Sequence, residues 1–189
     1  ILTIDLHANQ IQGFFNIPVD NLMALPSFIS HFEKEKLENI VVVSPDAGGV
    51  ERARLFSQRL HGDLAIAYKK RPEPNVAKVT HIIGDVEGKD AIIVDDMIDT
   101  AGTLVETVKT LKDLGTRRVF AVCTHGLFSG PAIERIEASS LEKVYVSDTL
   151  PLTDSKRKCE KIKVISVSKL FADAIDSIHN ETSVSNLFL

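Results

Sequence analysis

The stretch AIIVDDMIDTAGTLVETVKTL, residues 91–111, decides the fold. It opens with an unbroken apolar run, Ala91–Val94, which is typical of a strand buried on both faces. Two adjacent carboxylates follow, Asp95 and Asp96, and then a loop of small and hydroxylated residues, 99–103. Apolar side chains then recur at helical spacing. The sequence therefore predicts a strand, an acidic pair, a loop and an amphipathic helix in immediate succession.

This arrangement suits a phosphorylated sugar. The loop follows the carboxyl end of a strand, where open α/β sheets bind ligands. Free N–H groups of the loop and of the first helical turn, together with the helix dipole, favour a phosphate. The two carboxylates suit hydroxyl groups or a magnesium ion. Taken alone, the acidic pair is explained as well by capping of the helix or solvation of a turn.

The whole string DDMIDTAGT is more specific, because it resembles the phosphoribosyl-pyrophosphate-binding motif of the type I phosphoribosyltransferase fold. That fold houses both phosphoribosyltransferases and the synthetases that make phosphoribosyl pyrophosphate. The resemblance implies an α/β fold in which a parallel sheet is flanked by helices. The rest of the chain agrees, since expected strands alternate with expected helices. We expect strands at 2–6, 40–44, 64–68, 80–84, 91–94, 119–124, 143–146 and 162–167, and helices at 26–37, 50–60, 104–114, from 131, and 169–179.

Length and composition set further bounds. The 189 residues, 44% of them hydrophobic, predict one domain, residues 1–189. The net charge of −4 argues against a nucleic-acid partner, and no apolar run approaches the ~20 residues that cross a bilayer, so no membrane partner is expected. Cys123 and Cys159 lack metal-ligand spacing, which fits a reducing cytoplasm. The chain begins ILTIDLHA, without Met and inside an apparent strand, so we interpret it as the C-terminal portion of something longer.

The segment DLHANQIQGFFNIPVDNL, residues 5–22, places His7 directly after an expected strand. By itself such a residue is more often a hydrogen-bonded structural histidine. The segment, however, closely resembles one that is characteristic of ribose-phosphate pyrophosphokinases, the phosphoribosyl pyrophosphate synthetases. That resemblance implies that His7 helps bind the magnesium ion that accompanies ATP, and that most of the family's N-terminal domain is missing here.

The segment VVVSPDAGGVERAR, residues 41–54, is a second match. Asp46 lies at a strand-to-helix turn, where it is either an ordinary helix-entry residue or a polar ligand. The resemblance implies that Asp46 is the second magnesium-associated residue. Because magnesium prefers oxygen and keeps several waters, a site made only from His7 and Asp46 would be incomplete. Triphosphate oxygens would supply the remaining ligands.

The segment KKRPEPNVAKV, residues 69–79, places three cations before a proline-rich stretch that we expect to be a loop. A cationic run is usually a solvated surface. This one resembles the flexible catalytic loop of the synthetases, KRRPxPN, with Lys70 in place of the central arginine. The resemblance implies that Lys69 and Arg71 are catalytic and that Arg71 also contacts substrate. Mobile cations that close over phosphates supply charge neutralisation and exclude water.

The remaining matches concern the sugar and regulation. In the family, the residue that matches Asp95 binds ribose hydroxyls, Asp96 shares the hydroxyl or metal role, and the loop wraps the 5-phosphate. The loop residues are Asp99, Thr100, Ala101, Gly102 and Thr103. The terminal SVSNLF resembles a segment that forms a regulatory phosphate or ADP site between subunits, which implies roles for Ser183, Ser185 and Phe188. By pattern alone this segment is a frayed tail.

Together the resemblance implies transfer of the pyrophosphoryl group of ATP to the C1 hydroxyl of ribose 5-phosphate, giving phosphoribosyl pyrophosphate and AMP. It also implies Mg²⁺ as cofactor, phosphate as activator, a homo-oligomer (dimer or hexamer) and a cytoplasmic enzyme. Two alternatives stay open. A nucleobase phosphoribosyltransferase would share DDxxDTxGT but does not need DLHANQIQGFF or KKRPEPN. A non-catalytic regulatory subunit would keep the fold but lose parts of the catalytic apparatus, and Lys69 and Arg71 argue against it.

Overall fold

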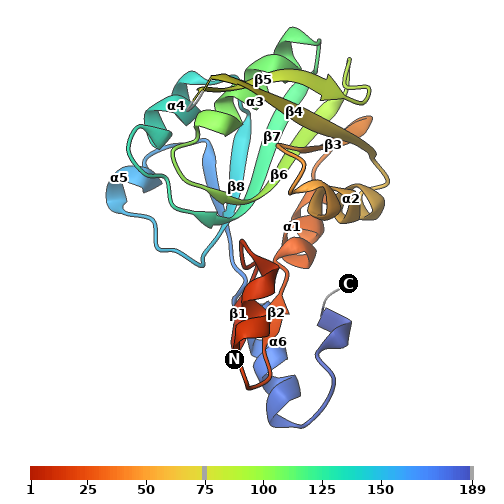
Figure 1. The fold of residues 1–189 in the computed structure, drawn as a ribbon, viewed down its shortest axis with the longest axis vertical. Coiled ribbons are helices and arrows are strands. Elements are labelled where there is room, and N and C mark those ends of the chain that lie inside the picture. Colours follow the sequence, from red (N-terminus) through yellow and green to blue (C-terminus); the bar gives the residue numbers. More distant parts are fainter. Residues whose placement is uncertain (74–75, 188–189) are drawn as a thin grey trace.

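The computed structural model describes the backbone of residues 1–73 and 76–187 and the side chains of residues 1–68 and 81–187. Within these ranges seven strands form one sheet in the order β5-β4-β3-β6-β7-β8-β9 (Figure 1). β4 and β5 are antiparallel, and the other neighbours are parallel. The strands are β3 (Ile40–Ser44), β4 (Asp63–Glu73), β5 (Val76–Ile83), β6 (Asp90–Ile98), β7 (Arg118–Gly126), β8 (Lys143–Ser147) and β9 (Ile162–Ile165).

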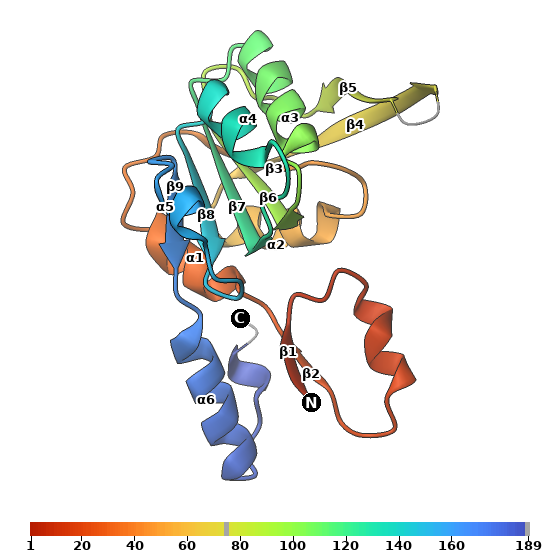
Figure 2. The ribbon, with the colours of Figure 1, turned by 90° about the vertical axis from the view of Figure 1, so that its left-hand side faces the viewer.

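Helices cover both faces of this sheet, with α3 and α4 on one face and α1 and α2 on the other (Figure 2). The burial follows the two-residue period of a strand, since Val41 and Val43 pack with α3 and α4 while Val42 packs with α1 and α2. None of the described helices is both long and apolar enough to cross a membrane. The covering helices are α1 (Leu25–Phe32), α2 (Val50–Arg59), α3 (Gly102–Asp113) and α4 (Ala132–Ala138).

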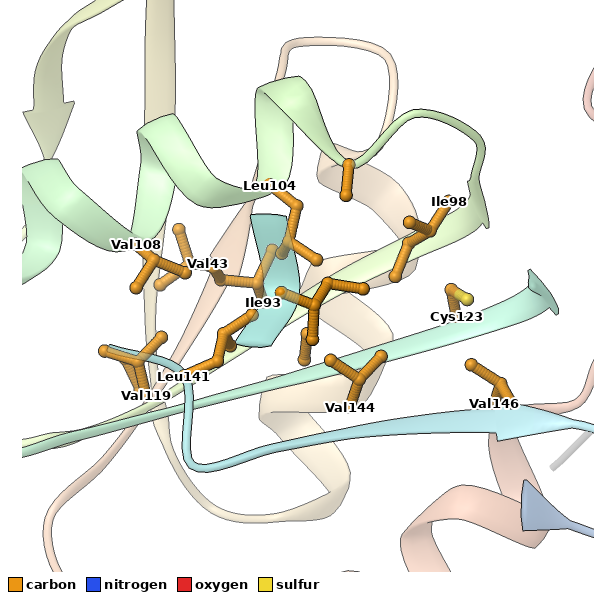
Figure 3. Packing of buried hydrophobic residues seen from close by; sticks show 14 of the residues in the cluster. Val43, Ile93, Ile98, Leu104, Val108, Val119, Cys123, Leu141, Val144 and Val146 are labelled. Atoms are coloured by element: carbon orange, nitrogen blue, oxygen red, sulfur yellow. The ribbon is translucent and has the colours of Figure 1, made fainter. Parts of the chain in front are cut away.

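The packing of α3 fixes where its N-terminus lies. Figure 3 shows Leu104 and Val108 of α3 directed at Val43 and Ile93 of the central strands, and all four are almost fully buried. Removing one such side chain to alanine costs about 2–5 kcal/mol in protein cores. The first turn of α3 is therefore held beside the carboxyl end of β6.

A smaller unit stands below the main sheet in Figure 2. It contains a two-stranded parallel sheet, β1 (Leu2–Ile4) and β2 (Asp20–Leu22), joined through a 3₁₀ helix, η1 (Asn9–Phe14). Its buried side chains share one apolar cluster with α6 (Ser168–His179). Three residues beyond β1, His7 contacts Asp96 of β6, which links this unit to the main sheet.

The segment 69–79 differs from the expected loop. β4 runs to Glu73 and β5 begins at Val76, and the two strands pair antiparallel with a register shift between Lys70 and Glu73. Pro72 lies at that irregularity, and proline, which has no N–H to donate, is tolerated at such edge positions. Pro72 therefore marks an irregularity in this hairpin, and the expected parallel sheet carries one antiparallel edge strand, β5.

Other differences from the expected elements are local. The expected helix 26–37 ends at Phe32, where the run Glu33–Lys36 begins, because those charged residues have no apolar face to bury. Short elements were not expected, because three to six residues are too few to show a periodicity. These are η1, β2, α5 (Asp154–Arg157) and η2 (Ser185–Leu187).

Candidate functional site

The connection from β6 to α3 is tight. β6 ends at Ile98 and α3 begins at Gly102, so residues 99–101 alone join them. Ala101 closes the turn with a left-handed backbone, at φ 58° and ψ 8°. For a residue that carries a Cβ, this conformation costs on the order of 1 kcal/mol and persists only where its surroundings enforce it. Strain of this kind is often found at ligand-binding sites.

A pocket of about 210 Å³ opens at this connection. His7, which follows β1, and Asp46, which follows β3, line it together with the continuous segment 95–104. Three separate parts of the chain therefore meet at one edge of the sheet. The pocket brings together predicted site residues His7, Asp46, Asp95, Asp96, Asp99, Thr100, Ala101, Gly102 and Thr103.

The pKa values of the two adjacent carboxyl groups, Asp95 and Asp96, shift in opposite directions. Burial, reinforced by the neighbouring Asp96 carboxylate, raises the pKa of Asp95 to about 7. Burial acts in the same direction on Asp96, but hydrogen bonding with Asp95 and His7 and the charge of Arg52 lower the pKa of Asp96 overall. Asp96 is therefore ionised at neutral pH, whereas Asp95 is only partly ionised.

His7 is paired with Asp96 through a distance of 2.6 Å between Nδ1 and Oδ2. A carboxylate oxygen only accepts hydrogen bonds, so Nδ1 carries the proton and donates it, and Nε2 is the other nitrogen of the ring. The hydrogen bond and the charge of Asp96 raise the pKa of His7 above its ordinary value. The His7 side chain is 72% exposed, whereas that of Asp96 is 6% exposed. A buried anion therefore orients an exposed imidazole at the pocket.

Arg52 of α2 extends this pair into a network. Its guanidinium lies 3.7 Å from Oδ1 of Asp96 and 3.9 Å from Oδ1 of Asp5. The buried Asp5 carboxylate also accepts hydrogen bonds from the backbone N–H of Ala24, at 2.9 Å, and the hydroxyl of Thr124, at 2.7 Å. The network ties the start of the chain to α2, β6 and β7.

Asp46 is held at the turn between β3 and α2. Its Oδ1 accepts hydrogen bonds from the N–H groups of Gly48 and Gly49, at 3.0 and 3.1 Å. A Cβ added to Gly49 would lie 2.9 Å from Oγ of Ser44, so a side chain there would force this turn to shift. The glycines therefore let the turn close around the Asp46 carboxylate.

The side chains of His7 and Asp46 supply only some of the ligands that a magnesium ion needs. Among the described residues, no group of three or more His, Cys, Asp or Glu is arranged to hold a metal ion. His7 and Asp46 line the same pocket and would supply one nitrogen and one carboxylate. Magnesium commonly keeps waters and binds through one or two protein groups plus substrate phosphates. The pocket fits an ion that arrives with phosphate ligands, not one caged by protein.

Some predicted site residues are not brought to this pocket. Ser183 and Ser185 lie beyond α6, where their hydroxyls are 2.9 Å apart, and neither lines the pocket. The side chains of Lys69 and Arg71 lie outside the described residues, as does Phe188. Their predicted roles remain predictions.

Sequence reasoning missed three charged residues around the site. Arg52 and Asp5 form the network beneath His7, and the Nη1 of Arg135 on α4 donates a hydrogen bond of 2.9 Å to the carbonyl of Thr100. Arg52 stands only two positions from Arg54, which pairs with Glu51 on the surface, and the sequence offers no signal that separates the two arginines. Asp5 directly follows β1, but the strand expected at 2–6 includes it.

Comparisons with known proteins place the chain in a family. A family model described as Phosphoribosyl synthetase-associated domain matches residues 69–189. The chain belongs to this family. The four sequence motifs predicted a resemblance to the phosphoribosyl pyrophosphate synthetases, and the comparisons confirm it.

Curated relatives of this chain include proteins named ribose-phosphate pyrophosphokinase. The chain is 54% identical over its whole length to a ribose-phosphate pyrophosphokinase of Caldanaerobacter subterraneus and 49% identical to one of Neisseria meningitidis, and covers 60% and 58% of them. The crystal structure of phosphoribosylpyrophosphate synthetase from Mycobacterium smegmatis matches 95% of the chain with a TM-score of 0.86 at 36% identity, over 58% of that chain. The expected α/β fold is confirmed. The chain spans about three fifths of the length of these relatives.

Proposed function

We propose that this chain carries the ribose 5-phosphate and magnesium sites of a ribose-phosphate pyrophosphokinase. In that reaction the C1 hydroxyl oxygen of ribose 5-phosphate forms a bond to the β-phosphorus of ATP. The bond from this phosphorus to the oxygen bridging the α-phosphate breaks, AMP leaves, and the hydroxyl proton passes to solvent. The observation that carries the proposal is the pocket that gathers His7, Asp46 and residues 95–104 in a chain with relatives of this name.

In this proposal the loop 99–103 binds the 5-phosphate. Within the described part of the chain, the backbone N–H groups of residues 99–104 donate no hydrogen bond to a protein acceptor. They are the donors that a helix N-terminus offers to an anion, reinforced by the positive end of the α3 dipole. A phosphate in the pocket would satisfy several of them at once.

In this proposal the two adjacent carboxylates, Asp95 and Asp96, have different roles. Asp95 is half-buried at the pocket, and we assign it to the ribose hydroxyls. Asp96 is engaged by His7 and Arg52, so its contribution is to hold the imidazole in place as well as to face the sugar. Fixing the sugar in this way converts an encounter with ATP into a positioned attack.

His7 and Asp46 would hold the magnesium ion, with phosphate oxygens and water as the other ligands. The ion would offset the negative charge of the triphosphate. Asp96 accepts the hydrogen bond from Nδ1 of His7, which leaves Nε2 as the ring nitrogen that could bind the ion. The two glycines after Asp46 keep its carboxylate at the pocket.

Lys69 and Arg71 are the proposed catalytic cations, and Arg71 also contacts substrate. The support is the match of KKRPEPN to the catalytic segment of the synthetases, within the region that the family model covers. Their positive charge would neutralise the transferring phosphoryl group, as phosphoryl transfer depends on positioning and electrostatics.

An assay for AMP tests the proposal. Purified protein is supplied with ATP, Mg²⁺ and ribose 5-phosphate, and AMP is quantified with and without the sugar phosphate. We expect AMP only when all three are present. Pyrophosphate release that needs a nucleobase and no ATP would support the phosphoribosyltransferase alternative. Binding of ribose 5-phosphate without any AMP would support the non-catalytic subunit, and loss of binding altogether would contradict both the site and the function.

The remaining proposals concern assembly and regulation. We propose a homo-oligomer, dimeric or hexameric, with phosphate as an activator acting through Ser183, Ser185 and Phe188, and a cytoplasmic location where ATP and ribose 5-phosphate are available. The support is the resemblance of the terminal SVSNLF to the regulatory segment of the synthetases. Sedimentation velocity with and without inorganic phosphate would test the assembly.

A further inference from the structure

The loop between β6 and α3 is anchored through three consecutive carbonyl groups. The carbonyl of Ile98 accepts hydrogen bonds from the N–H groups of Leu127 and Phe128, at 3.0 and 3.1 Å. The carbonyl of Asp99 accepts one from the N–H of Ser129, at 2.9 Å. The segment after β7 therefore binds the loop along its outer side through its own backbone.

The third carbonyl is bound differently. The carbonyl of Thr100 accepts a hydrogen bond from Nη1 of Arg135, at 2.9 Å. A side chain therefore anchors this third carbonyl, whereas backbone N–H groups anchor the first two. This guanidinium lies above the start of α3, because a Cβ added to Gly102 would be 3.4 Å from the same nitrogen. The Arg135 guanidinium therefore lies close to both Thr100 and Gly102, on either side of the left-handed Ala101.

Anchored carbonyls determine where the N–H groups point. In a trans peptide, the C=O of one residue and the N–H of the next point in opposite directions. Carbonyls 98, 99 and 100 are engaged on the side of β7 and α4, so the N–H groups of residues 99–101 are directed the opposite way. Without Arg135, the peptide between Thr100 and Ala101 would lose its anchor, and the left-handed Ala101 would lose a restraint on its backbone.

We propose that Arg135 is a positioning residue for the phosphate loop, holding the Thr100–Ala101 peptide so that its N–H faces the anion. This inference rests on the proposed function, because it concerns the same loop. Arg135 acts through the carbonyl of Thr100, and its positive charge adds to that of the α3 N-terminus. A planar guanidinium suits this role, since its fixed fork can hold a carbonyl at a defined angle.

Isothermal titration calorimetry with ribose 5-phosphate tests it on the whole chain. We expect Arg135→Ala to weaken affinity about 5- to 10-fold, the scale of one charge-assisted hydrogen bond that acts indirectly. Arg135→Lys should recover only part of the loss, because it keeps the charge without the fork. Glu134→Ala, an exposed neighbour on the same helix, is the matched control and should bind like wild type.

A second measurement separates positioning from general stability. Thermal unfolding without ligand should be nearly the same for wild type and Arg135→Ala, because the side chain is exposed and its hydrogen bond to Thr100 is exposed as well. Wild-type affinity in Arg135→Ala, while wild type binds ribose 5-phosphate, would overturn the inference and leave the proposed function intact. Full recovery in Arg135→Lys would also overturn it, because charge alone would then explain the effect. Failure of the wild-type chain to bind the sugar phosphate would contradict the phosphate-loop function itself.

Discussion

His7 donates a hydrogen bond of 2.6 Å from Nδ1 to Oδ2 of Asp96, although the two residues are 89 positions apart in the chain. One follows β1 of the small unit and the other lies in β6 of the main sheet. The bond joins the candidate metal ligand to the candidate sugar motif. It also ties the small unit to the main sheet at the edge where the pocket opens.

The first prediction concerns this pair. Asp96→Asn should move the pKa of His7 downward toward its ordinary value, because the amide keeps an acceptor but removes the negative charge. Since the folded pKa of His7 is raised, the stability that the pair contributes is fully present below about pH 6.5 and is lost as pH rises through the folded pKa. NMR titration of the His7 ring in metal-free buffer checks the shift.

Asp99→Asn is the matched control for that titration. Asp99 is an exposed carboxylate of the same loop and does not contact His7 among the described interactions. It should leave the His7 titration unchanged. Equal titration curves for wild type and Asp96→Asn would show that the pairing does not exist in solution.

The second prediction concerns Asp90, a fully buried carboxylate at the opposite end of β6. Burial opposes its ionisation, but Arg118 and Arg117 and the N–H of Glu38 hydrogen-bond it, and the pKa of Asp90 is lowered from 3.8 to about 2. A depressed pKa contributes stability that is present above about pH 4 and lost as pH falls through 2. The contribution at neutral pH is roughly 2 kcal/mol.

Urea unfolding of Asp90→Asn at pH 7 and pH 2.5 tests this value. We expect the variant to lose about 2 kcal/mol at pH 7 and clearly less at pH 2.5, where the wild-type carboxylate is itself partly protonated. Asp113→Asn, an exposed carboxylate at the end of α3, should change little at either pH. A deficit that stays the same at both pH values would mean that ionisation of Asp90 is not the cause.

The sequence predicts the strand, turn and helix of the candidate sugar motif well because their signals are local. The apolar run before Asp95 and the helical spacing after Gly102 set a strand, a turn and a helix without help from distant residues. The pocket follows, because parallel strands place their carboxyl ends at one edge. Asp46 follows β3, a parallel neighbour of β6, so this rule places it at the same edge. His7 follows β1 of the separate small sheet, and its assignment to the site came from the resemblance of its segment to the synthetases.

Interactions between distant side chains could not be predicted in the same way. Arg52 and Arg135 both lie on helices and look like ordinary surface arginines in the sequence. Only the packing of α2 and α4 against the sheet brings them to Asp96 and to Thr100. The pairing of β4 with β5 within residues 69–73 and 76–79 was missed for another reason, because prolines usually end strands and here Pro72 lies at a register shift.

The third prediction concerns Gly102. A Cβ at this position would meet only the ends of flexible side chains, Nη1 of Arg135 at 3.4 Å and Oγ1 of Thr100 at 3.8 Å. Gly102→Ala should therefore fold normally, and a bound phosphate, not the protein, would be crowded. We expect ribose 5-phosphate affinity to fall about tenfold or more, and the bulkier Gly102→Val to fall further.

Calorimetry and thermal unfolding together check the Gly102 variants. Gly13→Ala is the control, since a Cβ there would meet nothing within 4 Å and the residue lies away from the pocket. Unaltered affinity in Gly102→Val would remove the loop from the phosphate site. Loss of affinity accompanied by a large loss of stability would instead point to damage of α3.

The last prediction concerns Lys69. If its ammonium group neutralises charge on the transferring phosphoryl group, Lys69→Ala should slow AMP release by orders of magnitude, because such interactions act mainly in the transition state. Affinity for ribose 5-phosphate should stay nearly intact, since residues 95–104 that line the candidate sugar site belong to a different segment. Lys70→Ala is the matched control, one position along the same strand, where the synthetase motif has arginine. Turnover of Lys69→Ala equal to that of wild type would refute the catalytic role. Equal losses in the Lys69 and Lys70 variants would show that the net charge of the hairpin matters, and not the position of one side chain.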